Sequence, residues 1–263
     1  MLKKVLKYDL KYNYKILFVF YALALFFAFL TRFFLKIDNS LVMNVLGQIC
    51  GGVTVSMMFN IIINNLMRIW VRFNQNFYGD ESYLTHTLPI EKKTLYLSKF
   101  LSSIITLFSS IAVIVLSFFI AYGTKDLVNL VGNLLNSFSK SLNTKTYIII
   151  FALIVILFIE FLNALQCGFT GIILGHRRNS SKIGFSIIFG FLIYLASQSF
   201  VLIVTLIFAL FNDKFMNLFL TKEAVDINTL KAVILIAIIS YLIVIIVDFI
   251  LNLKLFKKGV NVD

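Results

Sequence analysis

Six long apolar runs alternate with short polar connections along the chain. The hydrocarbon core of a bilayer is crossed by a helix of about 20 predominantly apolar residues, and every one of these runs is long enough. The alternation therefore predicts an all-α polytopic membrane protein with six transmembrane helices. The predicted spans cover residues 16–35, 41–70, 95–122, 146–174, 183–211 and 230–253.

The segment before the first run, residues 2–15, is basic and amphipathic. Lysines recur every fourth residue on one helical face, and leucines recur at the same spacing on another (Lys3, Lys7, Lys11 and Lys15; Leu2, Leu6 and Leu10). Such a helix lies in the headgroup plane with its lysines towards anionic lipid. We therefore expect an N-terminal elbow helix at the membrane surface. The alternative is an ordinary basic flank of the first span.

Two connections carry short apolar patterns of their own. In residues 123–145, apolar side chains repeat at helical spacing, which predicts a helix lying on the surface (Leu127, Val131, Leu134, Leu135 and Phe138). Residues 212–229 contain an apolar core, Phe215–Leu220, that is too short to cross a bilayer. We expect this second connection to be re-entrant or interfacial.

Composition and charge agree with a membrane location and add an orientation. The chain of 263 residues is 60% hydrophobic and carries a net charge of +12. Its lysines and arginines gather at the ends of the spans, which favours membrane orientation over nucleic-acid binding. Of the 24, sixteen fall on the side of the two termini and eight on the other side. The positive-inside rule then places both termini in the cytoplasm.

No Pro-, Gly- or Ser-rich linker divides the chain, so residues 1–263 are predicted to form a single transmembrane domain. Four glycines at GxxxG spacing favour close helix packing: Gly47 with Gly51, and Gly171 with Gly175. Both cysteines, Cys50 and Cys167, fall within apolar runs and are interpreted as packing thiols.

The sequence contains none of the patterns GxxxxGK[ST], GxGxxG, HExxH or GxSxG. Neither His86 nor His176 has a second ligand at metal-binding spacing. We therefore expect no enzymatic activity, no metal and no cofactor in this chain by itself.

Two carboxylates fall inside predicted spans, where an ionised side chain is costly. Glu160 lies near the middle of the fourth span and Asp248 nearer the cytoplasmic end of the sixth. Two interpretations of Glu160 stay open: a substrate pathway that it lines together with other polar side chains, or a structural hydrogen bond, for example to Asn163. The predicted pathway residues are Glu160, Asn163, Tyr194 and Gln198. For Asp248 a structural role, paired with a lysine, is favoured.

The connection between the second and third spans reads FYGDESYLTHTLPIEKKTLYLSK over residues 77–99. It resembles the corresponding loop of ABC-2-type permeases, the membrane subunits of a class of ABC transporters. In many bacterial members this loop runs D-E-x-Y-L-T-H-T-L-P, then a few polar residues, then L-x-x-S-K. The matching positions are Asp80, Glu81, Tyr83, Leu84, Thr85, His86, Thr87, Leu88, Pro89, Leu95, Ser98 and Lys99.

The resemblance implies a permease subunit of an ABC exporter, located in a bacterial plasma membrane. Two separate cytoplasmic ATPase subunits would hydrolyse ATP with Mg²⁺, and a second permease copy or a homologue would complete the pathway. Residues 77–94 and 175–182 would be the coupling elements that dock on the ATPases. The implied coupling residues are Asp80, Glu81, Tyr83, Leu84, His86, Leu88, Pro89, His176, Arg177 and Arg178. For residues 175–182 a plain basic loop is the alternative.

Within the first coupling element, Asp80 and Glu81 are expected to face basic residues of the ATPase, and Tyr83 with Leu84 to form an apolar anchor. Pro89 disfavours α geometry at Leu88, so a helix is expected to start at Ile90 and run into the third span.

Exporters of this family move peptides, drugs, lipids and polysaccharides. The 29 phenylalanines fit a hydrophobic or amphipathic cargo, with an antimicrobial peptide as the first candidate. They fit lipid contact equally well. Two other functions stay open: an ion-coupled secondary transporter or channel that uses Glu160 and Asp248, and an intramembrane enzyme.

Overall fold

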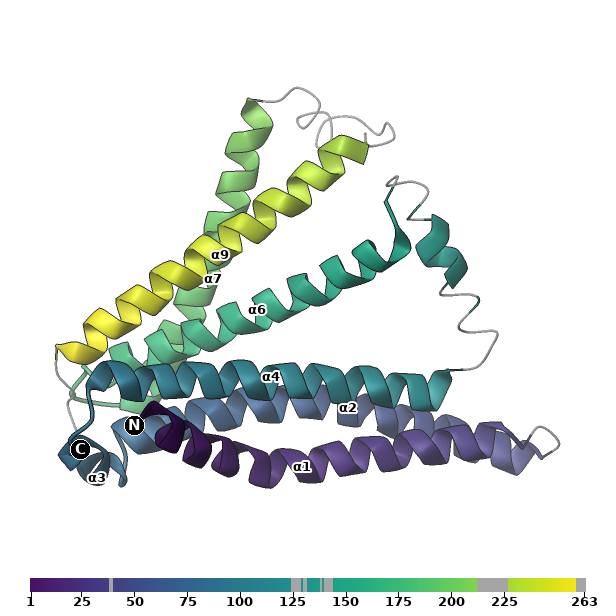
Figure 1. Ribbon diagram of the computed structural model, residues 1–263, viewed down its shortest axis with the longest axis horizontal. Coiled ribbons are helices and arrows are strands. Elements are labelled where there is room, and N and C mark those ends of the chain that lie inside the picture. The colour runs from purple at the N-terminus through teal and green to yellow at the C-terminus, as the bar shows by residue number, and fades with distance from the viewer. Residues whose placement is uncertain are drawn as a thin grey trace. The chain divides into compact units, whose positions relative to one another are not determined.

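The computed structural model describes residues 1–37, 40–123, 129, 132–137, 139, 144–211 and 227–258. Its helices are α1 (Leu2–Leu35), α2 (Leu41–Phe77), α3 (Ser82–Thr87), α4 (Lys92–Tyr122), α6 (Thr146–Gly175), α7 (Lys182–Leu210) and α9 (Ile227–Lys257) (Figure 1). Six of them are long and apolar enough to cross a membrane, and no strand occurs among the described residues. The predicted all-α class with six spans is confirmed at this level.

The predicted helix within residues 123–145 lies mostly outside the described residues, although residues 132–137 are helical. Most of the predicted re-entrant segment, residues 212–226, also lies outside them. The chain divides into two compact units, Met1–Leu130 and Val131–Asp263. The single transmembrane domain expected over residues 1–263 stays a prediction.

The first unit differs from expectation at its N-terminus, because α1 is one continuous helix from Leu2 to Leu35. The structure shows no break near residue 15 that would separate an elbow helix from the first span. The buried face of α1 begins within the basic segment and continues at steps of three and four residues (Asp9, Asn13, Leu17, Tyr21, Ala24, Ala28 and Thr31). The basic segment is therefore part of the bundle, and two polar side chains form the start of its buried face.

Helices α1, α2 and α4 pack against one another, and α3 follows the end of α2 (Figure 1). Their middle part combines apolar contacts with hydrogen bonds between helices. The Tyr21 hydroxyl lies 2.7 Å from Ser110 Oγ, Asn65 Nδ2 donates to the same Oγ at 2.6 Å, and Thr31 Oγ1 lies 3.1 Å from Thr54 Oγ1. Polar bonds of this kind hold helices together in lipid, where apolar burial drives association less.

These three helices have 34, 37 and 31 residues. At 1.5 Å per residue they are about 45–55 Å long, against about 30 Å for the hydrocarbon core. Each therefore continues beyond the core by several residues, which explains why α2 and α4 exceed the predicted spans. The N-terminus of α1, the C-terminus of α2 and the N-terminus of α4 lie at the same end of the unit (Figure 1).

In the second unit α6 packs against α7 and α9. Gly171 and Gly175 lie where the backbones of α6 and α7 meet. A Cβ atom at Gly171 would stand 2.5 Å from the Gly190 nitrogen, and one at Gly175 would stand 2.5 Å from the Ser186 nitrogen. Only glycine permits so close an approach. In the first unit, the atoms nearest to Gly47 and Gly51 are instead side-chain atoms, those of Leu35 and Tyr122 respectively.

Candidate functional site

The candidate site lies at the end of the first unit where α2 leads through α3 into α4. Helix α2 ends at Phe77, α3 covers Ser82–Thr87, and Leu88 adopts extended geometry before Pro89, as a proline requires of the preceding residue. Helix α4 begins at Lys92, two residues later than the predicted start at Ile90. Helix α3 is therefore a separate short element between two long helices.

Helix α3 presents an apolar surface to the outside of the unit. Tyr83 is 67% exposed and Leu84 74%, and Leu88 is also exposed. Asp80 and Pro89 lie at the surface beside them. His86 turns towards the chain, where its Nε2 lies 3.2 Å from the Phe77 carbonyl oxygen. Five of the predicted coupling residues thus share one exposed region.

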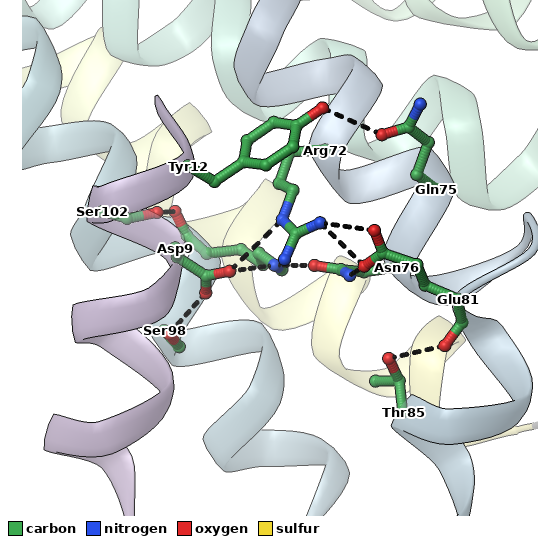
Figure 2. Close-up of polar contacts among 10 residues, drawn as sticks. Asp9, Tyr12, Arg72, Gln75, Asn76, Glu81, Thr85, Ser98 and Ser102 are labelled. Atoms are coloured by element: carbon green, nitrogen blue, oxygen red, sulfur yellow. Dashed lines mark hydrogen bonds and ion pairs between the residues drawn. The ribbon is translucent and has the colours of Figure 1, made fainter. Parts of the chain in front are cut away.

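Glu81 makes a different contact from the expected one. Its carboxylate accepts two hydrogen bonds from Arg72 Nη1, at 2.7 Å and 2.9 Å, and a further one from Asn76 Nδ2 (Figure 2). The expectation was a salt bridge between Glu81 and a partner protein. The structure pairs Glu81 with an arginine of its own chain, and Glu81 is also the N-cap residue of α3.

Arg72 also forms an ion pair with a buried carboxylate on α1, that of Asp9. Asp9 is only 2% exposed; its Oδ1 lies 3.8 Å from Arg72 Nε, and its Oδ2 accepts a hydrogen bond from Ser98 Oγ at 2.7 Å. Lys99 Nζ donates both to Asp9 Oδ1 and to Asn76 Oδ1. These contacts form a closed loop, because Asn76 also donates a hydrogen bond to Glu81. We call these five residues (Asp9, Arg72, Asn76, Glu81 and Lys99) the charge ring.

The charge ring is electrically balanced, with two carboxylates, one guanidinium and one ammonium. Lys99 is only 5% exposed, so both members of the Asp9–Lys99 pair are removed from water. Buried ion pairs contribute little net stability, but removing one partner typically costs about 3–5 kcal/mol because the other charge is left unpaired. The ring therefore fixes a particular arrangement of α1, α2 and α4 around Glu81.

Tyr12 lies against one side of the charge ring. The Cζ atom of Arg72 lies 4.2 Å from the centroid of the Tyr12 aromatic ring, and the Cζ atom of Arg68 lies 4.9 Å from it. Its hydroxyl donates to Gln75 Oε1 at 3.0 Å (Figure 2). Stacking of this kind stabilises a guanidinium by about 0.5–2 kcal/mol and fixes its plane, which keeps Arg72 directed at both carboxylates.

Asp9, Arg72, Asn76 and Lys99 were not predicted as members of one site. Arg72 was counted as a topological charge, and Lys99 as a topological charge and a position of the permease-like loop. A usable signal existed, because Asp9 is the one acidic residue in residues 2–15 and falls four residues before Asn13 and eight before Leu17. That spacing places it on the face that continues into the apolar run.

The second predicted coupling element, residues 175–182, is tied to its own unit. His176 is buried and its Nδ1 lies 2.9 Å from the Ile172 carbonyl oxygen; burial lowers the pKa of its imidazole below the usual value. Arg177 donates to the Leu255 carbonyl oxygen at 3.0 Å, and the guanidinium of Arg178 lies 5.8 Å from the rings of Phe185 and Phe189. Both arginines remain exposed.

Three of the four predicted pathway residues come together in the second unit. Glu160 Oε1 accepts hydrogen bonds from the Tyr194 hydroxyl at 2.7 Å and from Gln198 Nε2 at 2.8 Å, and the Tyr241 hydroxyl donates to Gln198 Oε1 at 2.5 Å. These residues belong to α6, α7 and α9. Asn163 does not join them: its Nδ2 donates to Ser197 Oγ at 3.0 Å.

In the described part of the chain, no lysine forms the ion pair expected for Asp248. Its described contact is with Cys167, whose Sγ lies 3.9 Å from Asp248 Oδ2. Cys50 and Cys167 are both free thiols. Among the described residues, no group of three or more His, Cys, Asp or Glu side chains could hold a metal ion.

Comparison with protein-family models, with curated proteins and with solved structures found no match for this chain.

Proposed function

We propose that this protein is the membrane subunit of an ABC exporter of the ABC-2 type, located in a bacterial plasma membrane with both termini in the cytoplasm. The observation that carries the proposal is the exposed apolar surface formed by Tyr83 and Leu84 on α3 and by Leu88 directly after it, in the loop that resembles the coupling loop of those permeases. An aromatic and a leucine exposed side by side on a short polar connection are suited to anchoring a protein partner.

The attachment of α3 to α2 supports the same proposal. A docking element must keep its position while a partner pushes on it. Glu81, the N-cap residue of α3, is hydrogen-bonded to Arg72 and Asn76 of α2. The chain has no P-loop for nucleotide phosphates, so ATP and Mg²⁺ would be bound by two separate ATPase subunits. The ATPases would dock on α3 and on the exposed arginines Arg177 and Arg178.

In this mechanism, closure of the ATPase pair around ATP moves α3, and the long helices carry the movement into the membrane. A second permease, identical or homologous, forms the other half of the pathway. The proposed cargo is hydrophobic or amphipathic, with an antimicrobial peptide as the first candidate.

The test is purification of the tagged protein from its native membrane in mild detergent. We expect a protein with a Walker A motif to co-purify in stoichiometric amount and the complex to hydrolyse ATP. Tyr83→Ala should weaken that association about thirtyfold, as expected for loss of an anchor worth about 2 kcal/mol. Phe108→Ala is the matched control, because Phe108 is as exposed as Tyr83 (69% against 67%) but lies within α4.

Absence of any ATPase from the unaltered complex would contradict the proposal. Equal losses from Tyr83→Ala and Phe108→Ala would place the contact elsewhere than on α3.

A second candidate function, ion-coupled transport, is favoured by the hydrogen-bonded cluster around Glu160. A carboxylate inside a span that accepts from Tyr194 and Gln198 resembles the proton-carrying groups of pumps and transporters. The two functions differ in proteoliposomes that contain a pH-sensitive dye. Ion coupling predicts proton flux down an imposed pH gradient that Glu160→Gln abolishes, whereas an ABC permease without its ATPase gives none.

A further inference from the structure

Helix α3 is linked to α1 by a route that does not follow the chain. Along the chain, α3 continues from α2 and leads into α4, while 46 residues separate the end of α1 from the start of α3. The charge ring nevertheless reaches from the N-cap residue of α3 to Asp9 on α1. The charge ring therefore links α3, the proposed docking element, to α1, a helix that is not next to α3 along the chain.

Two branches run from Glu81 to Asp9. One passes through Arg72, whose Nη1 donates to Glu81 and whose Nε faces Asp9 at 3.8 Å. The other passes from Asn76 to Lys99, whose Nζ donates to Asp9. Asn76 donates from its amide nitrogen to Glu81 and accepts at its amide oxygen from Lys99, so it connects the start of α3 with α4 directly and with α1 through Lys99.

The physical character of the ring suits transmission of movement. At its inner end Asp9 and Lys99 are shielded from water, where charged hydrogen bonds are strong and loss of one partner is costly. At its outer end the Glu81 side chain is 45% exposed, close to the surface of α3. A displacement of Glu81 therefore either moves Arg72, Asn76 and the buried pair with it or breaks charged bonds.

From this geometry we propose that Asp9 is a positioning residue, which holds α1 in register with α3 so that a push on α3 reaches α1 as well as α4. The transport consequence rests on the proposed function, whereas the linkage of α3 to α1 does not. Asp9 touches neither cargo nor ATPase in this scheme and acts through Arg72 and Lys99.

The linkage can be measured in the purified chain alone, reconstituted in lipid nanodiscs. Nitroxide labels are placed at Phe26→Cys on α1 and Leu84→Cys on α3, two exposed positions, in a background of Cys50→Ser and Cys167→Ser. Pulsed electron paramagnetic resonance then gives the distribution of distances between α1 and α3. The protein with an unaltered charge ring should give one narrow distribution of the distance between the two labels.

Asp9→Asn keeps the shape of the side chain but removes its charge, and we expect the distribution to broaden at least twofold. Asp9→Glu keeps the charge and should restore most of the narrow distribution, which a role in packing alone does not predict. Tyr14→Phe is the matched control: it removes another hydrogen bond between α1 and α4, from the Tyr14 hydroxyl to Ser109 Oγ at 2.9 Å, outside the ring. It should leave the distribution unchanged.

Glu81→Gln removes the negative charge that is paired with Arg72 at the exposed end of the charge ring, where folding is less at risk. It should broaden the distribution in the same direction. The proposal is overturned if Asp9→Asn or, should that variant not fold, Glu81→Gln leaves the distribution narrow. It is also overturned if Tyr14→Phe broadens the distribution as much as Asp9→Asn does. Because no ATPase is present, failure here is distinguishable from failure of the proposed function, which the co-purification experiment decides.

Discussion

Single side chains in the second unit show how a carboxylate is accommodated inside a membrane span. Glu160 is half-buried, and the two donors that reach it, Tyr194 and Gln198, bond the same oxygen, Oε1. The cluster continues from Gln198 to Tyr241 on α9. Since one acceptor atom serves both donors, the charge of Glu160 and its hydrogen-bonding role can be separated by substitution.

Substitution of Glu160 tests that separation. Glu160→Gln retains the acceptor oxygen and should change the free energy of unfolding by less than about 1 kcal/mol, while Glu160→Leu leaves two donors without it and should cost roughly 2–3 kcal/mol. Thermal unfolding of the purified protein in detergent measures both. If Glu160→Gln is as damaging as Glu160→Leu, the negative charge itself is required and the ion-coupled alternative gains support.

Among the helices, the contact of α6 with α7 depends on two glycines one turn apart. Gly171 and Gly175 face the backbone at Ser186 and Gly190, so backbone meets backbone without intervening side chains. Helices in lipid gain much of their association from such close approach. The α6–α7 crossing also determines where Glu160 on α6 meets Tyr194 and Gln198 on α7.

Gly171→Ala should force α6 and α7 apart, because its Cβ would stand 2.5 Å from the Gly190 nitrogen and neither backbone can yield alone. Overpacking of this type costs about 1–3 kcal/mol. Gly184→Ala is the control on α7, since its Cβ would meet nothing closer than 4.0 Å. Thermal unfolding should show a clear loss for Gly171→Ala and none for Gly184→Ala; equal behaviour would mean that the crossing tolerates a side chain.

Across the whole molecule, the elements that follow from local pattern were predictable and the contacts between distant segments were not. Apolar periodicity suffices for six helices, because a bilayer imposes the same length and composition on each. The charge ring joins residues as far apart as Asp9 and Lys99, which are 90 positions apart, and no local pattern encodes that meeting. Glu160, Tyr194 and Gln198 do lie together, because polar side chains inside spans are few and tend to face one another, whereas their role in a substrate pathway stays a prediction.

The predicted elbow helix shows that one sequence pattern can agree with two structures. The amphipathic pattern of residues 2–15 fits a separate helix at the membrane surface, and it also fits the first part of one long helix. The lysine spacing in residues 2–15 is amphipathic, and on that ground an interfacial helix was predicted. The same residues carry Asp9 and Asn13 on the buried face of α1, and the polar partners of Asp9 on α2 and α4 lie far along the sequence. The structure shows one continuous helix from Leu2 to Leu35 with Asp9 and Asn13 on its buried face, and the position of residues 2–15 relative to the membrane surface stays a prediction.

The last prediction concerns the orientation of the whole chain, which rests on the sixteen-to-eight distribution of basic residues. In a background of Cys50→Ser and Cys167→Ser, single cysteines replace exposed lysines or an asparagine at four described positions at or near the ends of helices: Lys36→Cys, Lys93→Cys, Lys145→Cys and Asn179→Cys. The positive-inside rule places residues 93 and 179 in the cytoplasm with the docking surface of α3, and residues 36 and 145 outside. A membrane-impermeant thiol reagent should label Lys36→Cys and Lys145→Cys in intact cells, and the other two only after permeabilisation. Labelling of Lys93→Cys in intact cells would put α3 on the outer face, where no ATP-hydrolysing partner could reach it.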